Sequence, residues 1–153
     1  MDRLERHLIW TELEKLTVDY WHEVDTNWGR GAHEYFVEDG TFQASNDTIF
    51  RGRNEIQKFY TWRESRGARV ARHLINNFRV SITDETHATA NWVLCLYAAD
   101  GSPVLPSLPP IQVSDSVDVC VRGSDGAWRY ASRRLTSLFA GGAAVTIPPP
   151  GTV

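Results

Sequence analysis

Two side chains of the sequence could work together in acid–base chemistry, His73 and Asp25. His73 lies in the stretch RVARHLINNFRV, whose other residues are typical of a β-strand. A neutral imidazole can take a proton from a substrate, and a nearby carboxylate would orient the ring and stabilise the imidazolium that forms. Ordinary interpretations stay open: a buried histidine bonded to a neighbour or a surface histidine at the start of a strand, and an aspartate at a helix end or in a turn. Spacing alone does not choose between them.

Other catalytic patterns are missing from the sequence. It has no G-x-G-x-x-G motif, no Walker loop and no G-x-S-x-G nucleophile motif. The five histidines form no H-x-x-x-H pair, and the two cysteines, Cys95 and Cys120, fit small core residues. We therefore expect no metal and no cofactor, which leaves acid–base chemistry by side chains alone.

Composition limits the class of protein. The chain has 153 residues, 42% of them hydrophobic, and a formal net charge of −3, which fits one globular domain. Its arginines are scattered and form no basic stripe, so nucleic acid is not the expected partner. No apolar run approaches the roughly 20 residues of a membrane span, and the N-terminus has no signal-peptide core. We expect a cytoplasmic protein with a small-molecule substrate and no membrane partner.

The elements that would position His73 and Asp25 begin with a helix over residues 4–24. Its apolar face repeats at helical spacing. The residues of this face are Ile9, Leu13, Leu16, Tyr20 and Val24. Asp25 follows directly, at the end of the helix. A short second helix is expected over residues 31–37, with a stop at Gly40.

The rest of the chain reads as a hairpin, a helix and four strands. TFQA and TIF flank SND, which predicts the hairpin, and Asn54 with Gln57 predicts a capping box for a third helix that Gly67 ends. The sequence predicts long strands at the following positions: 73–83, 87–99, 111–122 and 127–139. This order predicts an α+β domain, with N-terminal helices packed on a curved, mostly antiparallel sheet.

One domain is expected over residues 1–140, followed by a Gly- and Pro-rich tail over residues 141–153.

Within the first long strand, strict alternation would turn His73 away from the apolar stripe that includes Phe78. A bulge near Asn76–Asn77 would bring His73 and Phe78 to the same side.

The stretches LTVDYWHEVD, EYFVEDGTF, FRGRNEIQKFY, RHLINNFRV and DGAWRYASRRLTSLF together resemble the SnoaL-like group of the nuclear transport factor 2-like superfamily. The resemblance covers nearly the whole chain. Within the group the pattern is most similar to hexachlorocyclohexane dehydrochlorinase, also at the tail FAGGAAVTIPPPG, and more distantly similar to bile acid 7α-dehydratase and scytalone dehydratase. The resemblance implies a cone-shaped α+β barrel with a hydrophobic pocket, and a homo-oligomer, either a trimer or a dimer.

The resemblance also implies catalytic residues. The proton-removing histidine–aspartate dyad of the family falls on His73 and Asp25, and its active-site arginine falls on Arg133, with Arg134 as the alternative. Tyr20 occupies a position where the dehydrochlorinase has lysine and the bile acid dehydratase has tyrosine, so the catalytic set becomes His73, Asp25, Arg133 and Tyr20. This tyrosine favours elimination of water over elimination of chloride, because a departing hydroxide needs a proton donor.

Aromatic residues are expected to line the pocket, although each of them also fits plain core packing. The candidates are Trp21, Phe42, Trp92 and Tyr97. The predicted activity is that of a lyase of dehydratase type, or of a related isomerase or polyketide cyclase-like enzyme, on a small cyclic apolar substrate. Three alternatives stay open: a dehydrochlorinase, a ligand-binding or accessory domain without catalysis, and a structural subunit like the small β subunit of ring-hydroxylating dioxygenases.

Overall fold

The computed structural model describes residues 1–141, so the predicted tail over residues 141–153 lies outside the described residues except for Gly141. The elements are, in chain order, α1 (Arg3–Asn27), the 3-10 helix η1 (Ala32–Tyr35), β1 (Phe36–Gln43), β2 (Ile49–Arg51), α2 (Gly52–Ser65), β3 (Arg69–Ile82), β4 (His87–Asp100), β5 (Gln112–Arg122) and β6 (Trp128–Ala140). No helix in this part of the chain has the length and apolarity needed to cross a membrane.

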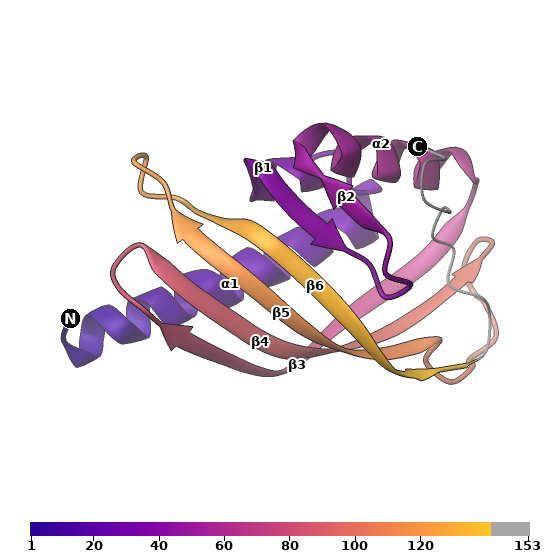
Figure 1. The fold of residues 1–153 in the computed structure, drawn as a ribbon. Coiled ribbons are helices and arrows are strands. Elements are labelled where there is room, and N and C mark those ends of the chain that lie inside the picture. Colours follow the sequence, from indigo (N-terminus) through magenta and orange to yellow (C-terminus); the bar gives the residue numbers. More distant parts are fainter. Residues whose placement is uncertain (142–153) are drawn as a thin grey trace.

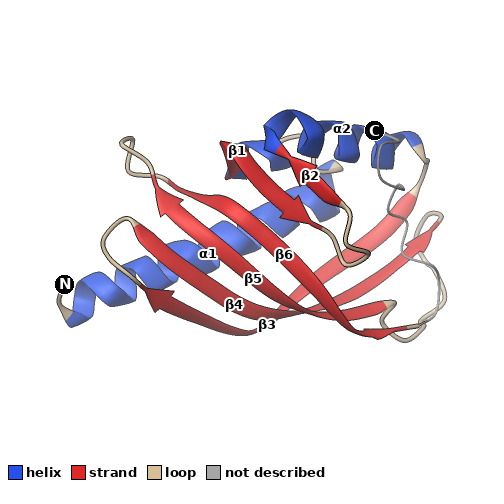
Figure 2. Cartoon of the chain, in the orientation of Figure 1, coloured by secondary structure: helices blue, strands red, loops and turns tan. Residues whose placement is uncertain are grey.

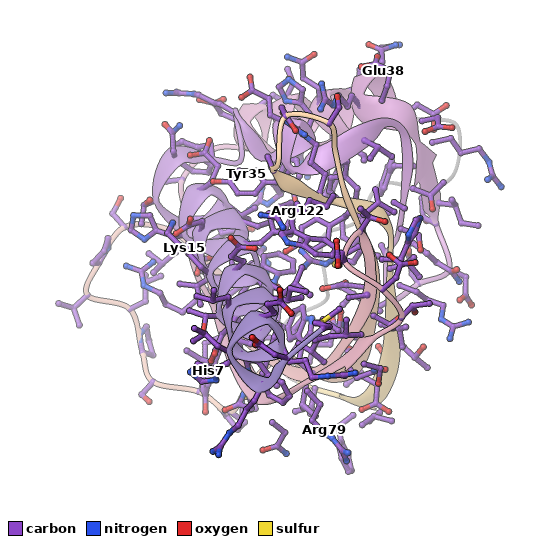
Figure 3. The ribbon with its side chains drawn as sticks, turned by 90° about the vertical axis from the view of Figure 1, so that its left-hand side faces the viewer. His7, Lys15, Tyr35, Glu38, Arg79 and Arg122 are labelled. Atoms are coloured by element: carbon purple, nitrogen blue, oxygen red, sulfur yellow. The ribbon has the colours of Figure 1, made fainter. Side chains whose placement is uncertain are left out.

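The strands form one curved sheet in the order β2-β1-β6-β5-β4-β3 (Figure 1). Neighbouring strands are antiparallel except β1 and β6, which run parallel. Both α-helices lie on the same side of the sheet (Figure 2), and the view along α1 shows this helix within the curve of the strands (Figure 3). The predicted α+β class is therefore confirmed. The sheet is not closed into a barrel, because β2 and β3 are its two edges.

The long helix α1 is set by its caps and by its apolar face. The side chain of Asp2 accepts from the backbone N–H of Glu5, whose carboxylate accepts in return from the N–H of Asp2, a capping box. Ile9 and Leu13 on the predicted apolar face are buried in the core. The helix continues to Asn27, so Asp25 lies in its last turn rather than after its end.

Two predictions about the second and third helices were wrong. Gly40 ends no helix: it lies inside β1, where a Cβ atom would stand 3.0 Å from the carbonyl oxygen of Tyr130 on β6, so glycine permits the close parallel pairing. No capping box forms at Asn54, because α2 begins two residues earlier, and Glu55 instead accepts from the backbone N–H of Arg51 at 2.6 Å.

The bulge predicted in β3 is confirmed. The pairing of β3 with β4 shifts between Asn76 and Arg79, and Asn77 has a positive φ of 53°. The less exposed positions follow one alternation up to Ile75 and the opposite alternation from Phe78 onward. The extra residue therefore keeps His73 on the helix-facing side of the sheet together with Phe78.

Candidate active site

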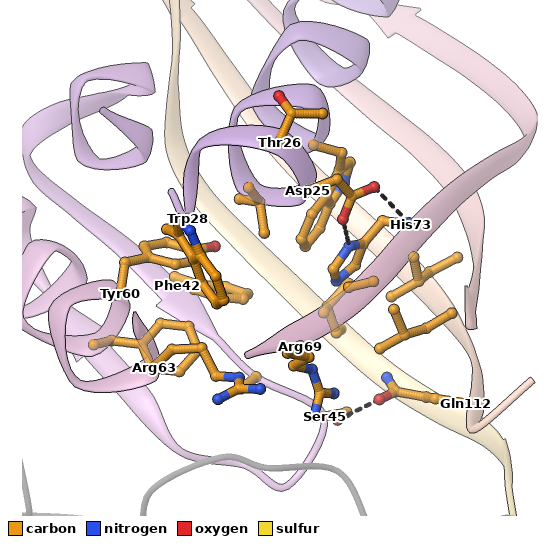
Figure 4. A pocket seen from close by; sticks show the side chains of 18 residues that line it. Asp25, Thr26, Trp28, Phe42, Ser45, Tyr60, Arg63, Arg69, His73 and Gln112 are labelled. Atoms are coloured by element: carbon orange, nitrogen blue, oxygen red, sulfur yellow. Dashed lines mark hydrogen bonds and ion pairs between the residues drawn. The ribbon is translucent and has the colours of Figure 1, made fainter. Parts of the chain in front are cut away.

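A partly open, mostly apolar cavity of about 220 Å³ lies between the C-terminal part of α1, α2 and the facing strands (Figure 4). Its walls include aromatic and aliphatic side chains from both α-helices, from several strands and from the residue that follows α1. Examples are Trp21, Trp28, Phe42, Phe59, Leu94 and Leu135. Polar groups enter at a few points, and His73 and Asp25 are two of them. A small apolar cavity with a few converging polar groups is typical of a small-molecule site.

The structure brings His73 and Asp25 together, as the sequence predicts. Nδ1 of His73 lies 2.6 Å from Oδ1 of Asp25, and the backbone N–H of His73 donates to Oδ2 at 2.9 Å. Both carboxylate oxygens of Asp25 thus hold His73. The side chain of His73 is only 12% exposed and that of Asp25 only 8%. Because a carboxylate accepts hydrogen bonds, Nδ1 carries the proton, which leaves the lone pair on Nε2. Figure 4 shows this second ring nitrogen turned away from Asp25.

The ring of His73 is also held by an aromatic neighbour. Trp21 stacks on it with ring centroids 4.0 Å apart and an interplanar angle of 11°. Burial lowers the pKa of His73 below its ordinary 6.5, against the opposing effect of Asp25, and the positive charges of Arg69 and Arg133 lower it further. The site therefore holds a neutral, oriented imidazole at neutral pH.

Arg133 faces the interior but does not line the cavity. It forms a fully buried ion pair with Asp118, with Nε at 2.8 Å from Oδ1 and Nη2 at 2.7 Å from Oδ2. Trp92 was predicted to line the pocket, but it donates its indole N–H to the same carboxylate at 2.8 Å and also lies behind the cavity wall. Arg134, the alternative arginine, is exposed. Strand alternation explains why Arg133 is buried and Arg134 is exposed, since neighbouring residues on β6 face opposite sides of the sheet.

Tyr20 is one layer behind the cavity wall, and its hydroxyl is hydrogen-bonded to the hydroxyl of Tyr60, which does line the cavity. Burial raises the pKa of Tyr20 to about 12 and also raises the pKa of Tyr60. Both phenols therefore stay protonated at neutral pH and can donate. This role of Tyr60 could not be predicted from the sequence. Its spacing from Ile56 and Phe59 on α2 is that of an ordinary core-facing helix side.

Of the four predicted pocket aromatics, Trp21 and Phe42 line the cavity. Tyr97 does not, because Leu94 and Leu96 of the same strand point inward and alternation turns Tyr97 to the outer face, where it is 42% exposed.

Two arginines on the cavity wall were not predicted. Arg63 comes from the last turn of α2 and Arg69 from the start of β3. The predicted strand begins at His73, four residues after the observed start of β3, so Arg69 was expected in a loop. Starting the alternation at Arg69 would have placed it on the face of His73.

Residues 8–134 match the SnoaL-like domain family, so the chain belongs to this family. No curated protein sequence matches the chain. Among solved structures it is similar to a scytalone dehydratase candidate from Novosphingobium aromaticivorans, with 19% identity, a TM-score of 0.79 and 97% of each chain covered. It is also similar to ActVI-ORFA from Streptomyces coelicolor, with 20% identity, a TM-score of 0.73, and 88% of this chain and 98% of that chain covered.

A third similar structure is an NTF2-like protein with a cystatin-like fold from Novosphingobium aromaticivorans, with 21% identity and a TM-score of 0.71. The aligned region covers 89% of this chain and 86% of that protein's chain. At these identities the structures show the fold, which is NTF2-like. The resemblance to the SnoaL-like group is confirmed at this level, whereas the closer similarity to hexachlorocyclohexane dehydrochlorinase stays a prediction.

Proposed function

We propose that this protein is a cofactor-independent lyase of dehydratase type, or a closely related isomerase or cyclase, acting on a small cyclic and largely apolar molecule. One observation carries the proposal: a neutral histidine, fixed by Asp25 and Trp21, presents its free nitrogen at the wall of a mostly apolar cavity. The SnoaL-like family and the scytalone dehydratase candidate among the similar structures support the same reaction class.

In the proposed reaction, Nε2 of His73 takes a proton from a substrate carbon next to an activating carbonyl group. The electron pair of the broken C–H bond forms the new C=C bond, and hydroxide leaves from the neighbouring carbon. Tyr60 donates a hydrogen bond to the departing oxygen. The proton on His73 then passes to the hydroxide, which gives water and restores the neutral histidine. Asp25 stabilises the imidazolium between these two steps.

The tyrosine pair favours water over chloride as the leaving group. Hydroxide is a poor leaving group and gains from a proton donor, whereas chloride needs only stabilisation of its charge. Tyr20 acts in this proposal through its hydrogen bond to Tyr60 and is therefore a positioning residue. Arg133 lies behind the wall and contributes to the position of Trp21, since its guanidinium carbon lies 5.2 Å from the centroid of that ring.

A bicyclic β-hydroxy ketone tests this proposal, because its product is easily seen. The β-hydroxy derivative of α-tetralone loses water to give naphthol, which absorbs in the near ultraviolet. We expect the wild-type protein to accelerate this dehydration and His73→Ala to abolish the acceleration while remaining folded.

His87→Ala is the matched control. His87 also contacts an aspartate, Asp84, at 3.1 Å, but this pair is exposed and outside the cavity. Its variant should keep full activity. Equal rates with and without wild-type protein would overturn the proposal in favour of a ligand-binding domain. Efficient chloride release from a chlorinated ring without any dehydration would instead indicate a dehydrochlorinase.

A further inference from the structure

We propose that Arg63 and Arg69 form a carboxylate-binding subsite at the end of the cavity opposite Asp25, so that the substrate is a cyclic carboxylic acid whose acid group lies away from the reacting carbon. This inference rests on the proposed function and names its substrate class. Figure 4 shows both guanidinium groups at that end of the cavity, away from the His73–Asp25 contact.

The two arginines are nearly buried although both are charged. Their side chains are only 11% and 12% exposed. Burial and the neighbouring charge of Arg69 lower the pKa of Arg63, which is the effect expected when like charges are brought together in a partly dry site. Asp100 opposes this shift in the pKa of Arg63, and a second anion, in the cavity, would offset the repulsion further.

Asp100 shows that a carboxylate fits both guanidinium groups. Its Oδ1 lies 3.2 Å from Nη2 of Arg63 and 3.4 Å from Nη1 of Arg69. Asp100 is 74% exposed and does not line the cavity, so it approaches from the solvent side. A guanidinium has five N–H donors in a fork that matches a carboxylate, and within residues 1–141 Arg63 makes one hydrogen bond, the one to Asp100. Donors of Arg63 therefore remain for a ligand.

The spacing along β3 fixes the shape of the ligand. Arg69, Ala71 and His73 all line the cavity from alternate positions of the strand. The outer two Cα atoms are about 13 Å apart at the usual rise of a strand. The small side chain of Ala71 leaves room for a ring between them. A cavity of about 150 Å³ binds benzene, so the 220 Å³ here accommodates a larger ring with a substituent.

Isothermal titration with two ring probes of matched shape tests the subsite. We expect the wild-type protein to bind β-naphthoate about tenfold more tightly than the uncharged β-naphthamide, as one charge-assisted contact would give. Arg63→Gln should remove this preference by weakening only the acid, and Arg63→Lys should retain part of it. Arg66→Gln is the control: this exposed arginine follows the same helix, does not line the cavity, and its loss changes the net charge equally.

Asp100→Asn separates ligand binding from a purely structural clamp between α2 and β4. In our proposal it tightens β-naphthoate binding, because a competing carboxylate is removed. Equal affinity of the wild type for both probes, an unchanged preference in Arg63→Gln, or weaker acid binding in Asp100→Asn would each overturn the subsite. His73→Ala should keep the preference, so a failed subsite is distinguishable from a failed catalytic assignment.

Discussion

The protonation of His73 determines how activity should depend on pH. Only the neutral ring can take a proton from a substrate, and burial lowers the pKa of this histidine below its ordinary 6.5. The ring of His73 therefore stays neutral at a lower pH than the ring of an ordinary histidine does. We expect the acidic midpoint of kcat/KM for dehydration to lie below pH 6.5. A pH–rate profile with its acidic midpoint at or above 6.5 would contradict the assignment of His73 as the base.

The hydroxyl of Tyr60 should matter for departure of the leaving group and not for removal of the proton. Tyr60→Phe keeps the ring that lines the cavity and removes only the hydroxyl. We expect it to slow dehydration by roughly 10²-fold, as for a lost proton donor. Tyr20→Phe should have a smaller effect, since Tyr60 keeps its own hydroxyl. Unchanged dehydration by Tyr60→Phe would show that this tyrosine only packs.

In β3, the backbone at Asn77 keeps the strand in the register that points His73 inward. A positive φ costs a residue with a bulky branched side chain roughly 1–2 kcal/mol, whereas glycine adopts it freely. We expect Asn77→Val to lower the free energy of unfolding by that amount and Asn77→Gly to leave it nearly unchanged. Urea unfolding measures both. Equal stability of the two variants would mean that the bulge does not fix the register.

The ion pair between β5 and β6 supports the wall behind the cavity. Arg133→Leu would leave Asp118 charged, buried and without its partner, which costs about 3–5 kcal/mol. The double variant Asp118→Leu with Arg133→Leu should recover most of this loss, because both charges are then absent. Urea unfolding again gives the comparison. A single variant as stable as the wild type would contradict this structural role.

Local patterns explain which elements the sequence could predict. Alternation and helical spacing located α1 and the four long strands, and they also located the bulge that turns His73 inward. Contacts between segments that are distant in the sequence could not be predicted from these patterns. Gly40 was predicted to stop a helix, but it lies in β1, which pairs in parallel with β6. Likewise, the Arg133–Asp118 pair depends on two strands whose register the sequence does not specify.

For the molecule as a whole, the open curved sheet and the two α-helices create a mostly apolar site from separate parts of the chain. The sequence could indicate His73 and Asp25 through the family resemblance, but Tyr60 and Arg63 enter the site only through the packing of α2 against the sheet, and Arg69 enters it because β3 begins four residues before the predicted strand. The expected homo-oligomer stays a prediction of the resemblance.

Removal of a proton from carbon without any leaving group isolates the role of His73 as the base. In deuterated water, α-tetralone exchanges the hydrogens next to its carbonyl, and NMR follows the loss of their signal. We expect the wild-type protein and His87→Ala to accelerate this exchange, Asp25→Asn to retain little of the acceleration, and His73→Ala to give the uncatalysed rate. Exchange in His73→Ala as fast as in the wild type would contradict the proposal that His73 is the base.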